Sequence, residues 1–164
     1  MKRRGGWMSP SRRKAQTAIE VLFITAIILA GIVLIVPPYL NENTAASIIS
    51  YVRGSASDAC AYLNTGVMIN ESIYTPLNAI INASNYTYRA FQLAGVRTAE
   101  INGTIQINIT ITYAGAGLSE STVEANIKQY IEDDLISKTN VVKQNGKLYL
   151  GGREIEINVD VVRV

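Results

Sequence analysis

Histidine is absent from this 164-residue chain, and cysteine occurs once, as Cys60. The absence of histidine removes the commonest general base and the commonest transition-metal ligand. A single cysteine excludes an intramolecular disulfide, and we interpret Cys60 as a small buried apolar side chain on a helix. The chain also lacks a nucleophile motif, a glycine-rich phosphate loop and a cysteine–histidine metal cluster. The sequence therefore predicts a protein that is not an enzyme and that holds no cofactor or metal.

Acidic residues are missing from the first 14 residues, whereas six of the 15 basic residues lie there. These six are Lys2, Arg3, Arg4, Arg12, Arg13 and Lys14. Counted from Gln16, the chain has 9 basic and 13 acidic side chains, and its net charge changes from +2 to −4. Because the basic cluster is confined to the N-terminus, it is more typical of a membrane-topology signal than of a nucleic-acid-binding arm. No nucleic-acid partner is predicted.

A long hydrophobic run follows the basic segment. Every residue from Val21 to Val36 is uncharged, and all but two are hydrophobic, until Pro37-Pro38 interrupts the run. A helix of about 20 apolar residues crosses a bilayer, so residues 19–36 are predicted to lie in a membrane. A lone carboxylate, Glu20, stands at the start of this helix. A carboxylate is costly in lipid and therefore requires a function or a partner.

The order of these parts resembles the N-terminus of archaeal type IV pilins and pilin-like proteins, which carry a class III signal peptide. In that family a short basic leader ends in a small residue, Gln commonly begins the mature chain, and a Glu four residues later precedes the apolar helix. Here Ala15 matches the end of the leader, Gln16 the new N-terminus and Glu20 the glutamate. Pro37 lies where bacterial type IV pilins often carry a helix-kinking proline. The resemblance covers about residues 12–40.

The same resemblance divides the chain into three parts. Residues 1–15 would be a leader that a prepilin peptidase removes, residues 16–64 a stalk helix, and residues 65–164 an extracellular head. Pro37-Pro38 are expected to kink or end the helix, because proline removes a hydrogen-bond donor and clashes with the preceding turn.

A structural function follows from this resemblance. The helix would lie in the cell membrane until Glu20 helps to dock it against other pilin subunits. The chain would then be a subunit, major or minor, of an archaeal type IV pilus-like filament on the cell surface. A head without the many evenly spaced strands of an immunoglobulin-like domain favours a minor subunit or a pilin-like envelope protein.

The N-terminal residues are also compatible with two simpler functions. An ordinary secretory signal peptide, cut at a small-residue site such as Thr44-Ala45-Ala46, would release a secreted protein. An uncut helix would leave a membrane-anchored protein. In either case the head would be a cell-surface module that binds a glycan or a protein.

Hydrophobic periodicity predicts two helices in the remainder of the chain. Apolar residues recur at three- and four-residue spacing over residues 41–64. A second helix is predicted over Ser121–Lys138, beginning with the capping-box pattern Ser121-x-x-Glu124. Its acidic run Glu132-Asp133-Asp134 is expected to be a solvated helix face, because it lacks the spacing of a calcium loop. Residues 66–95 lack periodicity and are predicted to form a long surface segment, with a short strand around Tyr86 to Phe91.

Alternating residues predict the strands. Ala99 to Tyr113 alternates apolar with polar side chains almost strictly, as expected of one strand with one buried face. Residues 141–144 and 147–150 flank Asn145-Gly146, a two-residue hairpin turn, and residues 154–162 alternate again. We therefore expect an α+β head, with an antiparallel sheet of four or five strands and one packed helix.

Glycosylation acceptor motifs are more frequent than the chain composition predicts. Chance gives about two Asn-x-Ser/Thr motifs, whereas five occur. They lie at Asn70, Asn82, Asn85, Asn102 and Asn108. In a translocated protein these positions would be surface sites for N-glycosylation.

Overall fold

The computed structural model describes residues 10–84, 90–114 and 117–164, without the side chains of residues 10–15 and 38–45. The chain divides into two compact units, Met1–Asn43 and Thr44–Val164. The helices are α1 (Pro10–Thr65), α2 (Thr75–Ala83) and α3 (Glu120–Lys138), with a 3-10 turn at Ser72–Tyr74. The strands are β1 (Phe91–Ile101), β2 (Thr104–Tyr113), β3 (Val142–Gln144), β4 (Lys147–Leu150) and β5 (Arg153–Arg163). The α+β class predicted from the sequence is confirmed.

Helix α1 is helical throughout its length, including Pro37 and Pro38. The prolines therefore do not end it. From Ile48 onward one face of α1 is buried in the second unit. Its buried apolar residues are Ile48, Val52, Ala56, Ala59, Cys60, Tyr62 and Leu63. The helix predicted over residues 41–64 is thus confirmed, and it contributes to the core of the head rather than only supporting it.

The five strands form one sheet in the order β1-β2-β5-β4-β3. The pairs β1–β2, β3–β4 and β4–β5 are antiparallel, but β2 and β5 are parallel. The expectation of an entirely antiparallel sheet is therefore wrong at this one junction. Alternation reveals which face of a strand is buried but not the direction in which its neighbour runs. The direction is decided here by α3, which lies between β2 and β5 in the chain, as parallel neighbours require a long crossover.

The single strand predicted over Ala99–Tyr113 is two strands. Asn102 and Gly103, with φ of 52° and 80°, form a turn that separates β1 from β2. The same Asn-Gly turn chemistry joins β3 to β4 at Asn145-Gly146, where the predicted turn is confirmed. Asn102 therefore lies at a hairpin tip and not on a strand face. The apolar–polar alternation continues through this first turn and conceals it.

Residues 66–95 contain more regular structure than their sequence indicates. Helix α2 begins with Pro76 in its first turn and buries Leu77, Ile80 and Ile81. Pro76 is the second residue of α2, where a backbone N–H has no intrahelical partner that proline could remove. Pro76 therefore starts a helix here instead of breaking regular structure. The strand expected around Tyr86–Phe91 falls mainly outside the described residues, and β1 begins at Phe91.

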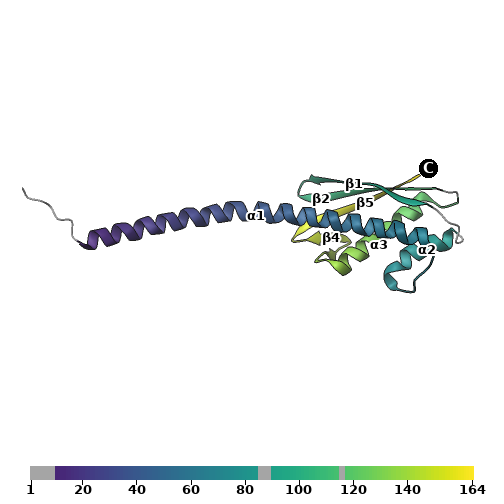
Figure 1. The fold of residues 1–164 in the computed structure, drawn as a ribbon, viewed down its shortest axis with the longest axis horizontal. Coiled ribbons are helices and arrows are strands. Elements are labelled where there is room, and N and C mark those ends of the chain that lie inside the picture. Colours follow the sequence, from purple (N-terminus) through teal and green to yellow (C-terminus); the bar gives the residue numbers. More distant parts are fainter. Residues whose placement is uncertain (1–9, 85–89, 115–116) are drawn as a thin grey trace, which may run out of the picture. The chain divides into compact units, whose positions relative to one another are not determined.

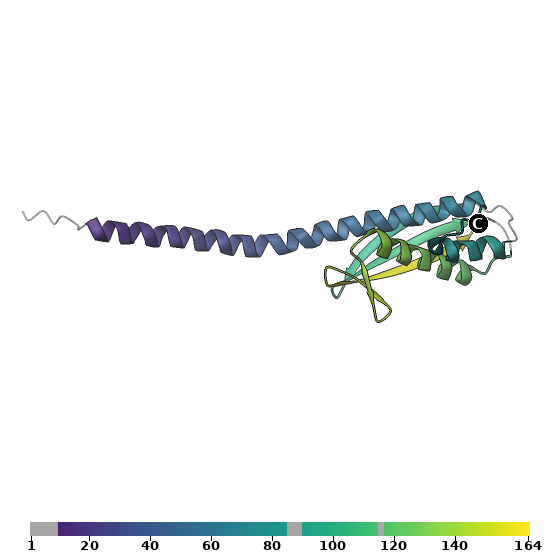
Figure 2. The same ribbon diagram turned by 90° about the horizontal axis from the view of Figure 1, so that it is seen from below.

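The core of the head is built on the apolar face of β2. Ile107, Ile109, Ile111 and Tyr113 are fully buried, and Ile105 is nearly so. The parallel partner β5 adds Ile155, Ile157 and Val161 to the same cluster, and α3 adds five apolar residues from one side of the helix. These α3 residues are Val123, Ile127, Tyr130, Ile131 and Leu135. The elements that meet in this core can be followed in Figures 1 and 2.

Helix α3 starts earlier than predicted and has no capping box. Its N-cap residue is Ser119, which makes no side-chain capping hydrogen bond, and Ser121 lies inside the first turn. Glu124 instead accepts a hydrogen bond from the Val161 N–H at 3.2 Å. The carboxylate that the capping box would have used thus connects α3 to β5.

Asn64, near the C-terminal end of α1, holds the start of the edge strand β1. Its Nδ2 donates to the Phe91 carbonyl at 2.8 Å, and its Oδ1 accepts from the Phe91 N–H at 2.7 Å. One amide side chain thereby satisfies both backbone groups of a strand residue. Leaving buried backbone groups without partners costs about 1–3 kcal/mol each.

We therefore expect Asn64→Ala to lower the free energy of unfolding by about 2 kcal/mol, because both Phe91 backbone groups lose their partner. Urea unfolding of the full chain in detergent, followed by circular dichroism, measures this change. Asn140→Ala, at an exposed position in a bend, is the matched control and should change stability by less than about 0.5 kcal/mol. Equal stability of the two variants would contradict the role given to Asn64.

Candidate functional site

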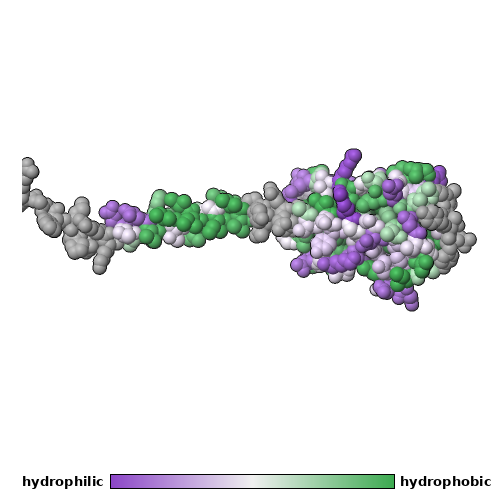
Figure 3. Space-filling view, viewed as in Figure 1, coloured by the Kyte–Doolittle hydropathy of each residue, from purple (hydrophilic) through white to green (hydrophobic). Residues whose placement is uncertain are grey.

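The most unusual surface of the protein is the N-terminal part of α1. Gln16–Pro37 forms a helical segment of 22 residues with a mean hydropathy of 2.9, long and apolar enough to cross a membrane. Its large apolar side chains are exposed on every side, with Leu22 at 72% and Leu34 at 75%. Figure 3 shows this apolar surface along the helix and a mixed, largely polar surface over the head. Soluble proteins rarely expose an apolar area of this kind, so the segment requires lipid or protein around it.

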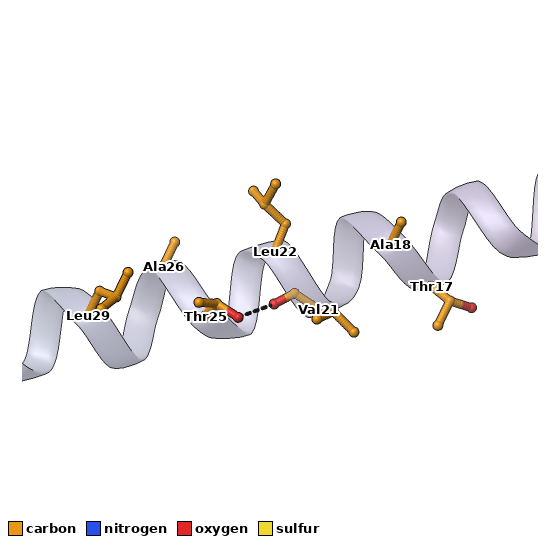
Figure 4. A pocket seen from close by; sticks show the side chains of 7 residues that line it. All are labelled: Thr17, Ala18, Val21, Leu22, Thr25, Ala26 and Leu29. Carbon is orange, nitrogen blue, oxygen red and sulfur yellow. Dashed lines mark hydrogen bonds between the residues drawn. The ribbon is translucent and has the colours of Figure 1, made fainter.

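Polar groups within this segment are few and close to its N-terminal end. Glu20 is exposed, and its Oε1 accepts a hydrogen bond from Gln16 Nε2 at 3.2 Å, one helical turn away. The Thr25 hydroxyl donates to the Val21 carbonyl at 2.8 Å, as drawn in Figure 4. Thr25 is therefore satisfied within its own helix, which suits an apolar environment. The Glu20 carboxylate can accept further hydrogen bonds besides the one from the Gln16 amide.

A shallow depression lies on one side of the same segment. Figure 4 shows the small side chain of Ala26 between the larger Leu22 and Leu29, and Ala18 on the other side of Leu22. It is a feature of the surface of one helix and encloses no cavity. Its lining is apolar apart from Thr17 and Thr25, so it offers shape for helix packing and no catalytic group.

The two residues at the predicted cleavage site lie in the first turns of α1. Gln16 is exposed, and the side chain of Ala15 is outside the described residues. The structure brings Gln16 and Glu20 together through their hydrogen bond. It leaves the cleavage prediction itself untested.

The predicted glycosylation sites differ in their surroundings. Asn70 lies in an exposed loop and Asn102 at the tip of the β1–β2 hairpin, whereas Asn85 is outside the described residues. Asn82 is exposed at the end of α2, but the hydroxyl of its partner Ser84 is buried and donates to the Ile81 carbonyl at 2.7 Å.

Asn108 lies in the middle of β2 on the open face of the sheet. Its Oδ1 accepts from Asn158 Nδ2 at 3.3 Å, so the side chain is engaged with β5. The two sequons with exposed, irregular backbone, at Asn70 and Asn102, are therefore the most accessible to a modifying enzyme.

Asp134 is predicted by the sequence to lie on a solvated helix face, but its carboxylate is buried. Asp134 is 2% exposed and lies between α3 and α1, so it is not part of a solvated face. It accepts a hydrogen bond from the Ser55 hydroxyl of α1 and pairs with Lys138 Nζ at 2.9 Å. The hydrogen bond with Asp134 raises the pKa of Lys138. The sequence contains no signal for this burial, because the contact joins residues that are 79 positions apart.

The carboxylates of this region also act on the hydroxyl of Tyr130. Burial, and after it the charges of Asp134 and Asp58, raise the pKa of the Tyr130 hydroxyl. Among the described residues no group of three His, Cys, Asp or Glu side chains is arranged to hold a metal ion.

Cys60 is 5% exposed in the core of the head, as predicted. Burial raises the pKa of its thiol from 9.0 to about 11. The thiolate is the reactive form, and both its population and its access are reduced here. Cys60 is thus a core residue and not a candidate nucleophile.

We predict that Cys60 in the folded chain reacts with iodoacetamide at pH 8 at least about 100-fold more slowly than in urea. Because the pKa is raised, the small thiolate fraction should keep increasing up to about pH 11 instead of levelling off above pH 9. Mass spectrometry of the alkylated chain measures both rates. The exposed variant Ser57→Cys, on the same helix, should react at the rate of a free thiol. Rapid labelling of Cys60 in the folded chain would contradict its burial.

For protein recovered from its native host, we expect glycopeptides at Asn70 and Asn102 in preference to Asn82 and Asn108. The reason is access, since the first two have exposed backbone in a loop and a turn. Mass spectrometry of glycopeptides gives the occupancy of each site. Asn102→Gln should remove its own glycan and leave that at Asn70 intact. Full occupancy of Asn108 with an empty Asn102 would contradict the ranking.

Comparison with known proteins adds no identification. No family model, no curated protein and no solved structure matches the chain. The function proposed below therefore rests on the apolar helix, on Glu20 and on the distribution of charge along the chain.

Proposed function

We propose that this chain is a prepilin-like structural subunit of an archaeal type IV pilus-like surface filament. A prepilin peptidase removes residues 1–15, and the mature chain assembles with other subunits through the N-terminal part of α1. The observation that carries the proposal is the segment Gln16–Pro37, a helix exposed and apolar on all sides with one carboxylate at its start.

The exposed apolar surface supports assembly through this helix. Burying one Leu, Ile or Phe side chain stabilises by about 1.5–3 kcal/mol, and this segment carries many such side chains. A bilayer covers them before assembly. Neighbouring helices of the same kind cover them equally well in a filament, so transfer from membrane to filament needs no loss of apolar contact.

Glu20 supports the proposal because its position has no use in a plain anchor. A carboxylate among apolar groups must find a positive partner or remain costly. Cleavage before Gln16 creates an α-amino group one helical turn from Glu20, and the same group on a neighbouring copy is the partner that the family resemblance implies. Gln16, which already donates to Glu20, keeps the carboxylate directed toward this end of the helix.

The charge distribution supports export and processing. The leader carries six basic residues and would remain inside the cell by the positive-inside rule, which sends the head outside. Its removal changes the net charge from +2 to −4 and frees the helix from its cytoplasmic anchor. The head then faces the medium as a structural domain. The proposal covers a major and a minor subunit alike.

We predict that the chain recovered from sheared surface filaments starts at Gln16, as read by mass spectrometry of its N-terminal peptide. Glu20→Ala should reduce its amount in the sheared fraction at least about tenfold, since the helix loses its charged partner contact. The head should remain folded, because Glu20 lies outside the unit Thr44–Val164.

Glu71→Ala is the matched control, because it removes an exposed carboxylate from the head and leaves the apolar helix unchanged. Assembly of this variant should equal that of the wild-type chain. A chain that starts near Ser47 would instead identify a conventional secreted protein, and an intact Met1 a membrane-anchored one. Either result, or normal assembly of the Glu20 variant, would overturn the proposal.

A further inference from the structure

The outward face of α1 in the head is open and lined by small side chains. Ser50, Gly54 and Ser57 are exposed there, opposite the buried face that begins at Ile48. A Cβ added at Gly54 would meet no atom within 4 Å. Glycine inside a helix lowers its stability by about 0.5–1 kcal/mol relative to alanine. No contact within the described head requires a glycine at position 54. Another helix could approach this face closely.

A cleft of about 250 Å³ lies beside this face, between α1 and α3. Its polar lining includes Asp58 from α1, and Asp134 and Lys138 from α3. Two carboxylates and one ammonium group give it a net charge of −1. Asp134 is already engaged by Ser55 and Lys138, whereas Asp58 is exposed and has no ion pair within the described residues. The cleft, with its net charge of −1, therefore offers an exposed carboxylate without an ion pair to a cation.

Arg53 is the cation that stands on the other border of the same face. It is exposed, and the described residues provide no hydrogen bond or ion pair for it. Four other basic residues of the described head are paired with carboxylates: Lys138, Lys143, Lys147 and Arg153. Arg97, Lys128 and Arg163 also have no ion pair among the described residues, but they belong to β1, α3 and β5 and not to this face of α1. Asp58 lies five positions after Arg53, which places the two residues about 140° apart around the helix. Arg53 therefore cannot enter the cleft of its own chain.

We propose that this cleft receives the Arg53 guanidinium of a second copy of this chain, packed in parallel along the outward face of α1. This inference rests on the proposed function and adds a specific contact between heads. The small side chains of the outward face lie between the two charges and allow the helices to approach.

The contact is heterologous and repeats without closing. Each copy offers its Arg53 to one neighbour and its cleft to another, which is the arrangement that generates an open helical array. Five residues of helix correspond to about 7.5 Å along the axis. Where Arg53 of one copy lies level with Asp58 of the next, the two copies are offset by this distance along their helices.

Charge reversal in the full chain tests this contact, with the amount of protein in the sheared surface fraction as the readout. Arg53→Asp and Asp58→Arg should each reduce that amount at least about tenfold, because like charges then face each other. The double variant Arg53→Asp with Asp58→Arg should restore it to within about threefold. Arg97→Asp, which removes an exposed cation from β1, is the matched control and should assemble normally. Circular dichroism of the detergent-solubilised chains checks that each variant is folded.

A second measurement detects the contact directly. In filaments of the Arg53→Lys variant, a zero-length carbodiimide reagent should join position 53 of one copy to Asp58 of another, and Asp58→Asn should abolish this cross-link.

The outcomes separate this inference from the proposed function. If the wild-type chain is absent from the sheared fraction, the filament proposal fails. If wild type assembles and both single reversals do so as well, only the Arg53 contact is wrong. Loss with Asp58→Arg but not with Arg53→Asp would identify another cation as the occupant of the cleft. Loss in both singles without rescue in the double variant would likewise overturn the pairing.

Discussion

The head depends on the burial of one apolar row, the face of β2 that carries Ile107, Ile109, Ile111 and Tyr113. This strand lies between β1 and β5, so its apolar face is flanked by strands on both sides. Helices cover the face itself. The opposing apolar surface comes from α2, α3 and the C-terminal part of α1, which is apolar on one face. Truncating a buried isoleucine in such a row typically costs about 2–5 kcal/mol, which is a large part of the stability of a small domain.

Polar contacts decide how the helices are seated on this core. Asp134 joins α3 to Ser55 of α1, and Asn64 joins α1 to the backbone of β1. Tyr62 accepts a hydrogen bond from the Ile69 N–H at 2.7 Å and donates to Asn78 Oδ1 at 2.6 Å, which connects α1 to the following loop and to α2. Hydrogen bonds of buried and half-buried side chains require a specific geometry, so they specify one position of the helices where apolar packing alone tolerates several.

The two parts of α1 meet different physical demands. Before Pro37 the helix is apolar on all sides, and no face of it can be left to water. From Ile48 onward one face is apolar and the other carries small and charged side chains such as Gly54, Arg53 and Asp58. A protein built on such a helix can have its apolar part covered by lipid or by other helices while its head folds in water. The proposed filament uses this division, with apolar contact in one part and charge pairing in the other.

Local patterns in the sequence are sufficient for the fold class, the apolar segment, the buried faces of α1, α3 and β5, and the Asn145-Gly146 turn. Each of these depends on a periodicity or on a turn chemistry that neighbouring residues carry themselves. The position of Glu20 at the start of the apolar helix can likewise be recognised from the sequence alone. The parallel pairing of β2 with β5, the burial of Asp134 and the use of Glu124 against β5 are decided only by the tertiary structure. In each case the outcome depends on a partner far away in the chain, and no short-range pattern encodes the direction or the identity of that partner.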